Sequence, residues 1–148
     1  MSRQLSQHFH EDEFRCKGQT CGPDGGPCGL AIVSPRLVAA LEELRTLSGN
    51  RGVLIRWDKD PVTGIYRSGS GYRCRAHNRA VGGVDGSMHT LGMAADIRVI
   101  GLTPPEVAKL AEQVLAFSAG GIGIYDGFTH VDVSTKRRAR WNNSRRWR

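Results

Sequence analysis

Apolar residues recur at helical spacing in two long segments, which we expect to be the main helices. Residues 34–49 begin with Ser34 as a cap and a proline in the first turn, and they end near a glycine. Residues 103–121 begin in the same way at Thr103. The expected inner faces are Leu37, Leu41 and Leu44 in the first helix and Val107, Leu110, Val114 and Leu115 in the second. A shorter helix is expected over residues 75–83, where two glycines end it.

Shorter apolar runs predict strands between and after these helices. Residues 52–57 and 94–100 are two such runs. Residues 121–133 hold two alternating runs joined at Asp126 and Gly127, a dipeptide favoured in β-hairpin turns. A small antiparallel sheet with helices packed against it predicts an α+β fold, and the length of 148 residues predicts a single domain, residues 1–148.

Composition and charge indicate which kinds of partner the protein could bind. The chain is 39% hydrophobic and 24% charged, which is typical of soluble globular domains, and no apolar run approaches the roughly 20 residues needed to span a bilayer. The start, MSRQLSQHFHEDEF, has no apolar core, so we expect no secretory signal. Part of the net charge of +7 lies in residues 134–148, which we expect to form a basic tail. With Trp141 and Trp147 among arginines, this tail is either a solvated terminus or a binding site for a polyanion, such as nucleic acid or phosphate-rich wall polymer.

The last predicted strand carries polar side chains on one face. Period-two alternation places Phe128, His130 and Asp132 on this face and apolar Val131 and Val133 on the other. An imidazole and a carboxylate are poor choices for a surface that serves only packing. This face is therefore a candidate for a functional site.

A second histidine and aspartate pair lies upstream, in the segment SMHTLGMAADI at residues 87–97. Asp96 is at the start of a predicted strand, and His89 lies in the loop before it. If this strand neighbours the final hairpin, His89, Asp96 and His130 converge. Two imidazoles and one carboxylate are a common catalytic zinc set that leaves a fourth position for water. The alternative is that these are hydrogen-bonded structural residues, and spacing alone does not decide between the two interpretations.

The chain resembles the M15 peptidases in two segments, SGYRCRAHNRAVGGVDGSMHTLGMAADI and GIGIYDGFTHVDV. The likeness is to a compact branch with an SGYR segment, an S-x-H-x-x-G-x-A-x-D core and a final H-x-D strand, and the early HFHEDEF also resembles it. These enzymes are zinc D-alanyl-D-alanine carboxypeptidases and peptidoglycan endopeptidases, including phage endolysins. The resemblance implies a hedgehog or D-Ala-D-Ala peptidase-like fold with zinc ligands at His89, Asp96 and His130.

The resemblance also implies roles for residues around the metal. Arg73 of SGYR would hold a substrate carbonyl or carboxylate and steady the oxyanion. Ser87 either donates a hydrogen bond near the site or only forms a turn. Many relatives carry an acid three residues before the last histidine ligand, where this chain has Gly127. We therefore expect Asp132 to be the general base, although it is also placed to orient a ligand; Asp126 is the second candidate.

The four cysteines raise a separate question. Cys16, Cys21 and Cys28 lie in one glycine-rich loop, and Cys74 follows Arg73. The spacing C-x4-C-x6-C is looser than the tight pairs of well-defined zinc modules. Free thiols and a second, structural zinc site are equally compatible with it, and disulfides are less favoured in a chain without a secretory signal.

Together, the residues and the resemblance predict a zinc-dependent peptidase that hydrolyses peptide bonds of bacterial peptidoglycan stem peptides or cross-links, as a phage or prophage endolysin. We expect a monomer that is synthesised in the cytoplasm and acts on the cell wall after release, held by anionic wall polymers on its tail. Nucleic acid is a less favoured partner. The alternative is a non-catalytic module that keeps the fold and binds wall or nucleic acid. The insertion-like WDKDPVTGIYR forms either a wall of the substrate groove or an exposed hairpin.

Overall fold

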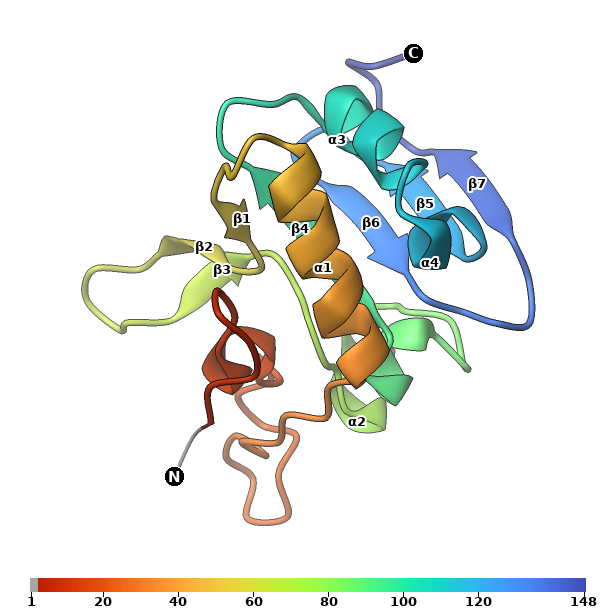
Figure 1. Cartoon of the computed structure of the whole chain (residues 1–148). Helices are drawn as coiled ribbons and strands as arrows, with labels where there is room; N and C mark the ends of the chain where they lie inside the picture. The colour runs from red at the N-terminus through yellow and green to blue at the C-terminus, as the bar shows by residue number, and fades with distance from the viewer. Residues whose placement is uncertain (1–2) are drawn as a thin grey trace.

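The structure, a computed structural model, describes residues 3–148 and contains a five-stranded sheet and a separate two-stranded hairpin (Figure 1). The helices are η1 (Glu11–Phe14), α1 (Pro35–Leu47), α2 (Arg75–Ala80), η2 (Met88–Leu91), α3 (Pro104–Ala111) and α4 (Leu115–Ser118). The strands are β1 (Val53–Leu54), β2 (Trp57–Lys59), β3 (Tyr66–Ser68), β4 (Ala94–Val99), β5 (Gly121–Ile124), β6 (Thr129–Asp132) and β7 (Ala139–Asn142). Within residues 3–148, no helix has the length and apolar character that a membrane crossing requires.

The large sheet has the strand order β1-β4-β6-β5-β7, and α1, α3 and α4 cover one of its faces (Figure 1). Neighbouring strands are antiparallel except β5 and β7, which are parallel, so the sheet is mixed rather than purely antiparallel. This confirms the predicted α+β class. The apolar stripe of α1 is buried as expected, and Val131 and Val133 from the sheet belong to the same core.

The second predicted helix is interrupted, and one of its expected inner residues is on the surface. α3 ends at Ala111, and the backbone of Val114 is extended before α4 begins. This break changes the helical phase, so Val114 and Phe117 face the core while Leu115 is 80% exposed. The prediction for Leu115 was wrong because it assumed one uninterrupted helix.

The two strands that carry the candidate site residues are neighbours, which is the condition set above for their convergence. β4 and β6 are antiparallel partners, and their register places Asp96 opposite His130 and Ala94 opposite Asp132. Because alternate residues of a strand point to the same face, Asp96, His130 and Asp132 share the face that α1, α3 and α4 leave uncovered.

The basic segment expected to form a tail is in part a strand of the sheet. Residues 139–142 form β7, which pairs with β5 at the edge of the sheet. Arg140 anchors this strand, because its guanidinium binds both carboxylate oxygens of Glu112 at 2.7 and 2.8 Å. After β7, the backbone N–H groups of Arg145 and Arg146 donate to Asp126. The segment is thus integrated into the domain.

Candidate metal centre

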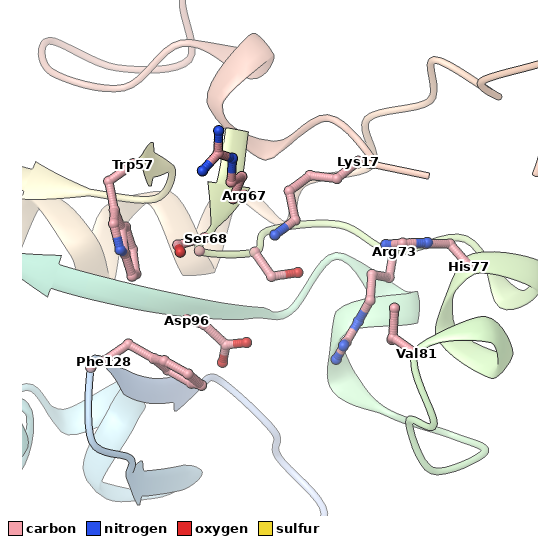
Figure 2. Close-up of a pocket in the computed structure, with 12 residues that line it drawn as sticks. Lys17, Trp57, Arg67, Ser68, Arg73, His77, Val81, Asp96 and Phe128 are labelled. Carbon is pink, nitrogen blue, oxygen red and sulfur yellow. The ribbon is translucent and has the colours of Figure 1, made fainter. Parts of the chain in front are cut away.

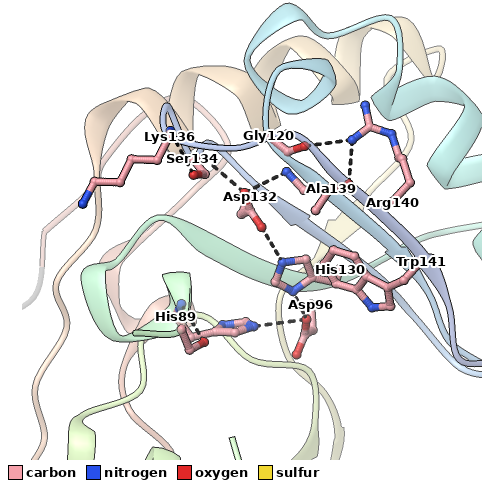
Figure 3. A network of polar contacts seen from close by, with 12 residues as sticks. His89, Asp96, Gly120, His130, Asp132, Ser134, Lys136, Ala139, Arg140 and Trp141 are labelled. Atoms are coloured by element: carbon pink, nitrogen blue, oxygen red, sulfur yellow. Dashed lines mark hydrogen bonds and ion pairs between the residues drawn. The ribbon is translucent and has the colours of Figure 1, made fainter. Parts of the chain in front are cut away.

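His89, Asp96 and His130 converge at one point on the uncovered face of the sheet (Figure 3). One ligand atom from each lies within 4.8 Å of the others. The Oδ1 atom of Asp96 is 3.2 Å from Nε2 of His89 and 3.0 Å from Nδ1 of His130. The structure therefore brings together the three candidate zinc ligands that the sequence indicates.

A short helical turn presents His89 to this centre. Ser87 caps η2, where its hydroxyl accepts a hydrogen bond from the backbone N–H of His89. The Nδ1 atom of His89 lies 2.8 Å from the carbonyl oxygen of Gly71, and the backbone N–H of Arg73 donates to the carbonyl of His89. With Nδ1 donating to Gly71, Nε2 is the nitrogen that faces Asp96. Ser87 therefore caps this turn, and it also lines the cavity beside the three converging residues.

Small residues between His89 and Asp96 are required by close packing. Gly92 has a positive φ of 69°, and an added Cβ would overlap the carbonyl of Ile32. Ala94 and Ala95 are fully buried. The chain can turn from η2 into β4 in this space only because these side chains are small.

His130 is held from the side opposite Asp96. Its Nε2 lies 2.8 Å from Oδ2 of Asp132. The other carboxylate oxygen of Asp132 accepts hydrogen bonds from the backbone N–H groups of Gly121 and Ser134, at 2.8 and 3.1 Å. When Nε2 carries the proton and donates a hydrogen bond to Asp132, Nδ1 is unprotonated and faces Asp96, so its lone pair is available to a metal ion.

Trp141 of β7 forms a further wall of the centre. Its ring centroid is 5.0 Å from that of His130, and its indole N–H donates to the hydroxyl of Tyr125. An added Cβ at Gly123 would overlap the indole, and one at Gly121 would overlap the Asp132 carboxylate. Our sequence reasoning missed Trp141 and both glycines, although the alternating GIGI of β5 was a visible signal that one strand face needs space.

The electrostatics of the centre favour a positive charge. Burial lowers the pKa of His130, but hydrogen bonds to Asp132 and Asp96 outweigh it and raise that pKa well above its usual range. Burial raises the pKa of Asp96, yet the neighbouring imidazoles of His89 and His130 hold it far below its ordinary value. Burial also opposes ionisation of Asp132, and the contact with His130 again lowers the pKa of that carboxyl. Nitrogen and carboxylate donors in such a field fit a zinc ion.

Two adjoining cavities open beside the centre. The larger, about 770 Å³, is lined by His89, Asp96 and His130. The smaller, about 330 Å³, shares Asp96 and Arg73 with it. Figure 2 shows the residues around the smaller cavity, which include Lys17, Trp57, Arg67, Arg73, His77 and Phe128. Trp57 and Arg67 belong to the β2–β3 hairpin, so the insertion-like segment forms one wall of this cavity.

Arg73 brings a positive charge to the junction of the two cavities. Its Nε is buried and has no hydrogen-bond partner in residues 3–148. Burial lowers the pKa of Arg73, and the charge of Asp96 opposes this shift. Because a guanidinium stays protonated and offers several donors, Arg73 is suited to bind a carboxylate or a carbonyl oxygen.

The two candidate general bases have different surroundings. Asp126 is exposed, and its carboxylate accepts hydrogen bonds at 2.9 Å from the backbone N–H groups of Arg145 and Arg146. It lines a separate cavity together with Trp147. Asp132 lines the larger cavity but is occupied by His130 and two backbone groups. Among the described residues, Asp85 is a further acid on that cavity, and it lies in an Asp-Gly turn outside the motifs described above.

Comparison with known proteins identifies a family. The model of a family described as Peptidase M15 matches residues 7–132, which is most of the chain. The matched region contains the three converging residues, Arg73 and Asp132. No curated protein and no solved structure matches the chain significantly.

Proposed function

The chain belongs to the peptidase M15 family, and on that premise we propose that it is a zinc-dependent peptidase of bacterial peptidoglycan. Its substrates would be the peptide bonds of stem peptides or of their cross-links. The observation that carries this proposal is the convergence of His89, Asp96 and His130 beside Arg73, at cavities large enough for a peptide segment.

Each group around the centre has a task in peptide hydrolysis. His89, Asp96 and His130 would hold the zinc ion, which supplies Lewis acidity that polarises a carbonyl and activates water. Arg73 would bind a substrate carboxylate or carbonyl and stabilise negative charge that develops on oxygen. The contacts of Asp132 support a positioning role, in which it fixes the orientation of the His130 ring, over the general-base role.

The cations around the smaller cavity support an anionic substrate. Lys17, Arg67 and Arg73 line it, whereas Asp96 is its acidic lining residue among those described. Stem peptides carry free carboxylates, and a cationic wall would attract and orient them. The β2–β3 hairpin, which contributes Arg67, would then select for the peptide that fits beside it.

We further propose that the protein acts as a phage or prophage endolysin. It would be made in the cytoplasm, reach the wall after release and work there as a monomer. The net charge of +7 supports retention on anionic wall polymers, an attraction that weakens as salt concentration rises.

The decisive experiment treats purified peptidoglycan sacculi with the zinc-loaded protein and analyses the soluble products by mass spectrometry. We expect new peptide termini, loss of their release after chelation, and recovery on adding zinc. The fragment masses would identify the bond. The matched control is His130→Ala, which should release none.

If the zinc-loaded protein releases no termini from several wall types, the peptidase proposal fails. Co-sedimentation with sacculi then tests the alternative. A non-catalytic binding module would sediment equally well as wild type and as His130→Ala.

A further inference from the structure

The four cysteines gather at one point outside the His-Asp-His centre. The Sγ atoms of Cys16, Cys21, Cys28 and Cys74 all lie within 4.8 Å of one another, and those of Cys16 and Cys21 are 4.0 Å apart. Three come from the loop at residues 16–30, and the fourth caps α2. Tetrahedral zinc with Zn–S bonds of about 2.3 Å would place its sulfurs roughly 3.8 Å apart, so only a small contraction is needed.

We propose that these four thiolates bind a second zinc ion with a structural role. A site with four protein ligands has no open position for water, which is the feature that separates structural from catalytic zinc. Two disulfides would instead divide the sulfurs into two close pairs, and the cluster shows no such division.

The backbone around the cluster is shaped to hold it. An added Cβ at Gly18 would lie 2.5 Å from the sulfur of Cys21 and 3.1 Å from the side chain of His77, so only glycine lets the loop fold over α2 here. The backbone N–H of His77 donates to the sulfur of Cys74 at 3.4 Å. The N–H of Cys16 donates to the carbonyl of Leu30 and closes the loop. Such contacts orient metal-binding thiolates.

Neighbouring cations provide the countercharge for the cluster. Four thiolates around a divalent zinc ion carry a net charge of −2. Lys17, Arg56 and Arg73 all lie within electrostatic range of Cys16. Two guanidinium nitrogens of Arg56 are buried without a hydrogen-bond partner in the described part of the chain. An anionic metal cluster would compensate this buried charge.

The cluster also adjoins the substrate cavities. Cys16 precedes Lys17, and Cys74 follows Arg73; both cations line the smaller cavity. Zinc bound by the four cysteines would tie the N-terminal loop to the SGYR segment and so fix the two cations relative to each other. This positioning effect rests on the proposed function, whereas the metal site itself does not.

The test is the zinc content of the purified full-length chain, measured by elemental mass spectrometry after zinc loading and removal of free metal. We expect two zinc ions per chain, one in a Cys21→Ser/Cys28→Ser double variant and one in the matched His89→Ala variant. Cobalt substitution separates the sites, because a thiolate-to-cobalt charge-transfer band should persist in His89→Ala and disappear in the cysteine variant.

Wild-type measurements keep the test valid if the cysteine variant fails to fold. Zinc should protect all four thiols from alkylation, and a strong chelator should remove the protection. A zinc-loaded wild-type chain whose four thiols are alkylated as fast as without zinc, or whose denatured mass reveals disulfides under reducing purification, would overturn the proposal. If His89→Ala still binds two zinc ions, the proposed catalytic site fails and the cysteine site stands.

Discussion

At the scale of single residues, the tightest constraint on the candidate centre is the contact between Asp132 and His130. The carboxylate contacts the ring nitrogen that faces away from Asp96, and its second oxygen is held by two backbone groups. A carboxylate used in this way sets the tautomer and the orientation of a metal-binding imidazole. It does so without touching the metal.

This contact predicts that Asp132→Asn weakens zinc binding by about 10–100-fold, which is the usual cost of removing such an outer partner. Competition with a chromophoric chelator measures the affinity. Asp126→Asn is the matched control and should leave zinc affinity unchanged, because Asp126 contacts the C-terminal segment. Unchanged affinity in Asp132→Asn together with lost turnover would instead identify Asp132 as the general base.

At the scale of elements, the N-terminal segment is fastened to α1 by one carboxylate. Glu42 accepts hydrogen bonds from the hydroxyl of Ser6 at 2.5 Å and the backbone N–H of His8 at 2.8 Å, and its other oxygen contacts the His8 ring. Burial raises the pKa of Glu42, but these hydrogen bonds outweigh it and hold that pKa below the ordinary value of 4.5.

We therefore expect Glu42→Gln to lower the free energy of unfolding by about 1 kcal/mol at neutral pH. Because the folded state depresses this pKa, the ionised carboxylate stabilises the fold fully above the unfolded value and loses its effect as pH falls through the folded value. The gap between wild type and variant should begin to close as pH falls below about 4.5 and should vanish once pH is below the folded value. Urea unfolding at a series of pH values measures it, and a gap independent of pH would contradict the assignment.

The elements also show what the sequence could and could not predict. Helical caps, the α1 stripe and the Asp-Gly hairpin are local signals, and the alternation in β6 correctly separated His130 from the core-facing valines. The break before α4 depends on how Val114 packs, which no local pattern encodes. β7 was missed because the arginine-rich segment around it resembles a solvated tail; the charge of Arg140 is compensated by Glu112, a partner distant in sequence.

The candidate site divides in the same way. Strand alternation and one assumed strand pairing bring Asp96 and His130 together, and the short loop before the strand keeps His89 close to Asp96. The role of Trp141 was not predictable, because it depends on the parallel pairing of β7 with β5. The cysteine cluster was left open for a related reason: Cys74 is distant in sequence from the other three, and only the fold shows that it joins them.

At the scale of the whole molecule, residues 134–148 complete the sheet and extend beyond the part that matches the family. Removing them should therefore destabilise the domain, not merely weaken its retention on a wall. We expect a chain ending at residue 133 to lose about 3 kcal/mol or more, comparable to removing a large packed aromatic, and to bind zinc less tightly.

Urea unfolding and chelator competition measure both effects. The matched variant Lys136→Gln/Arg145→Gln removes two exposed charges while keeping β7. It should unfold within about 0.5 kcal/mol of wild type and bind polyanions more weakly at low salt. If the shortened chain keeps the unfolding midpoint of wild type, the segment is only an appended tail.

The pairing of Asp96 with His130 across β4 and β6 makes the stability of the fold depend on the concentration of free zinc. Both residues belong to the middle of the sheet, so their donor atoms meet only while the sheet is intact. Occupancy and folding then become a single equilibrium governed by mass action. Above the dissociation constant of this site, each tenfold rise in free zinc would add about 1.4 kcal/mol to the free energy of unfolding. Metal supply would thereby set the fraction of molecules that is folded.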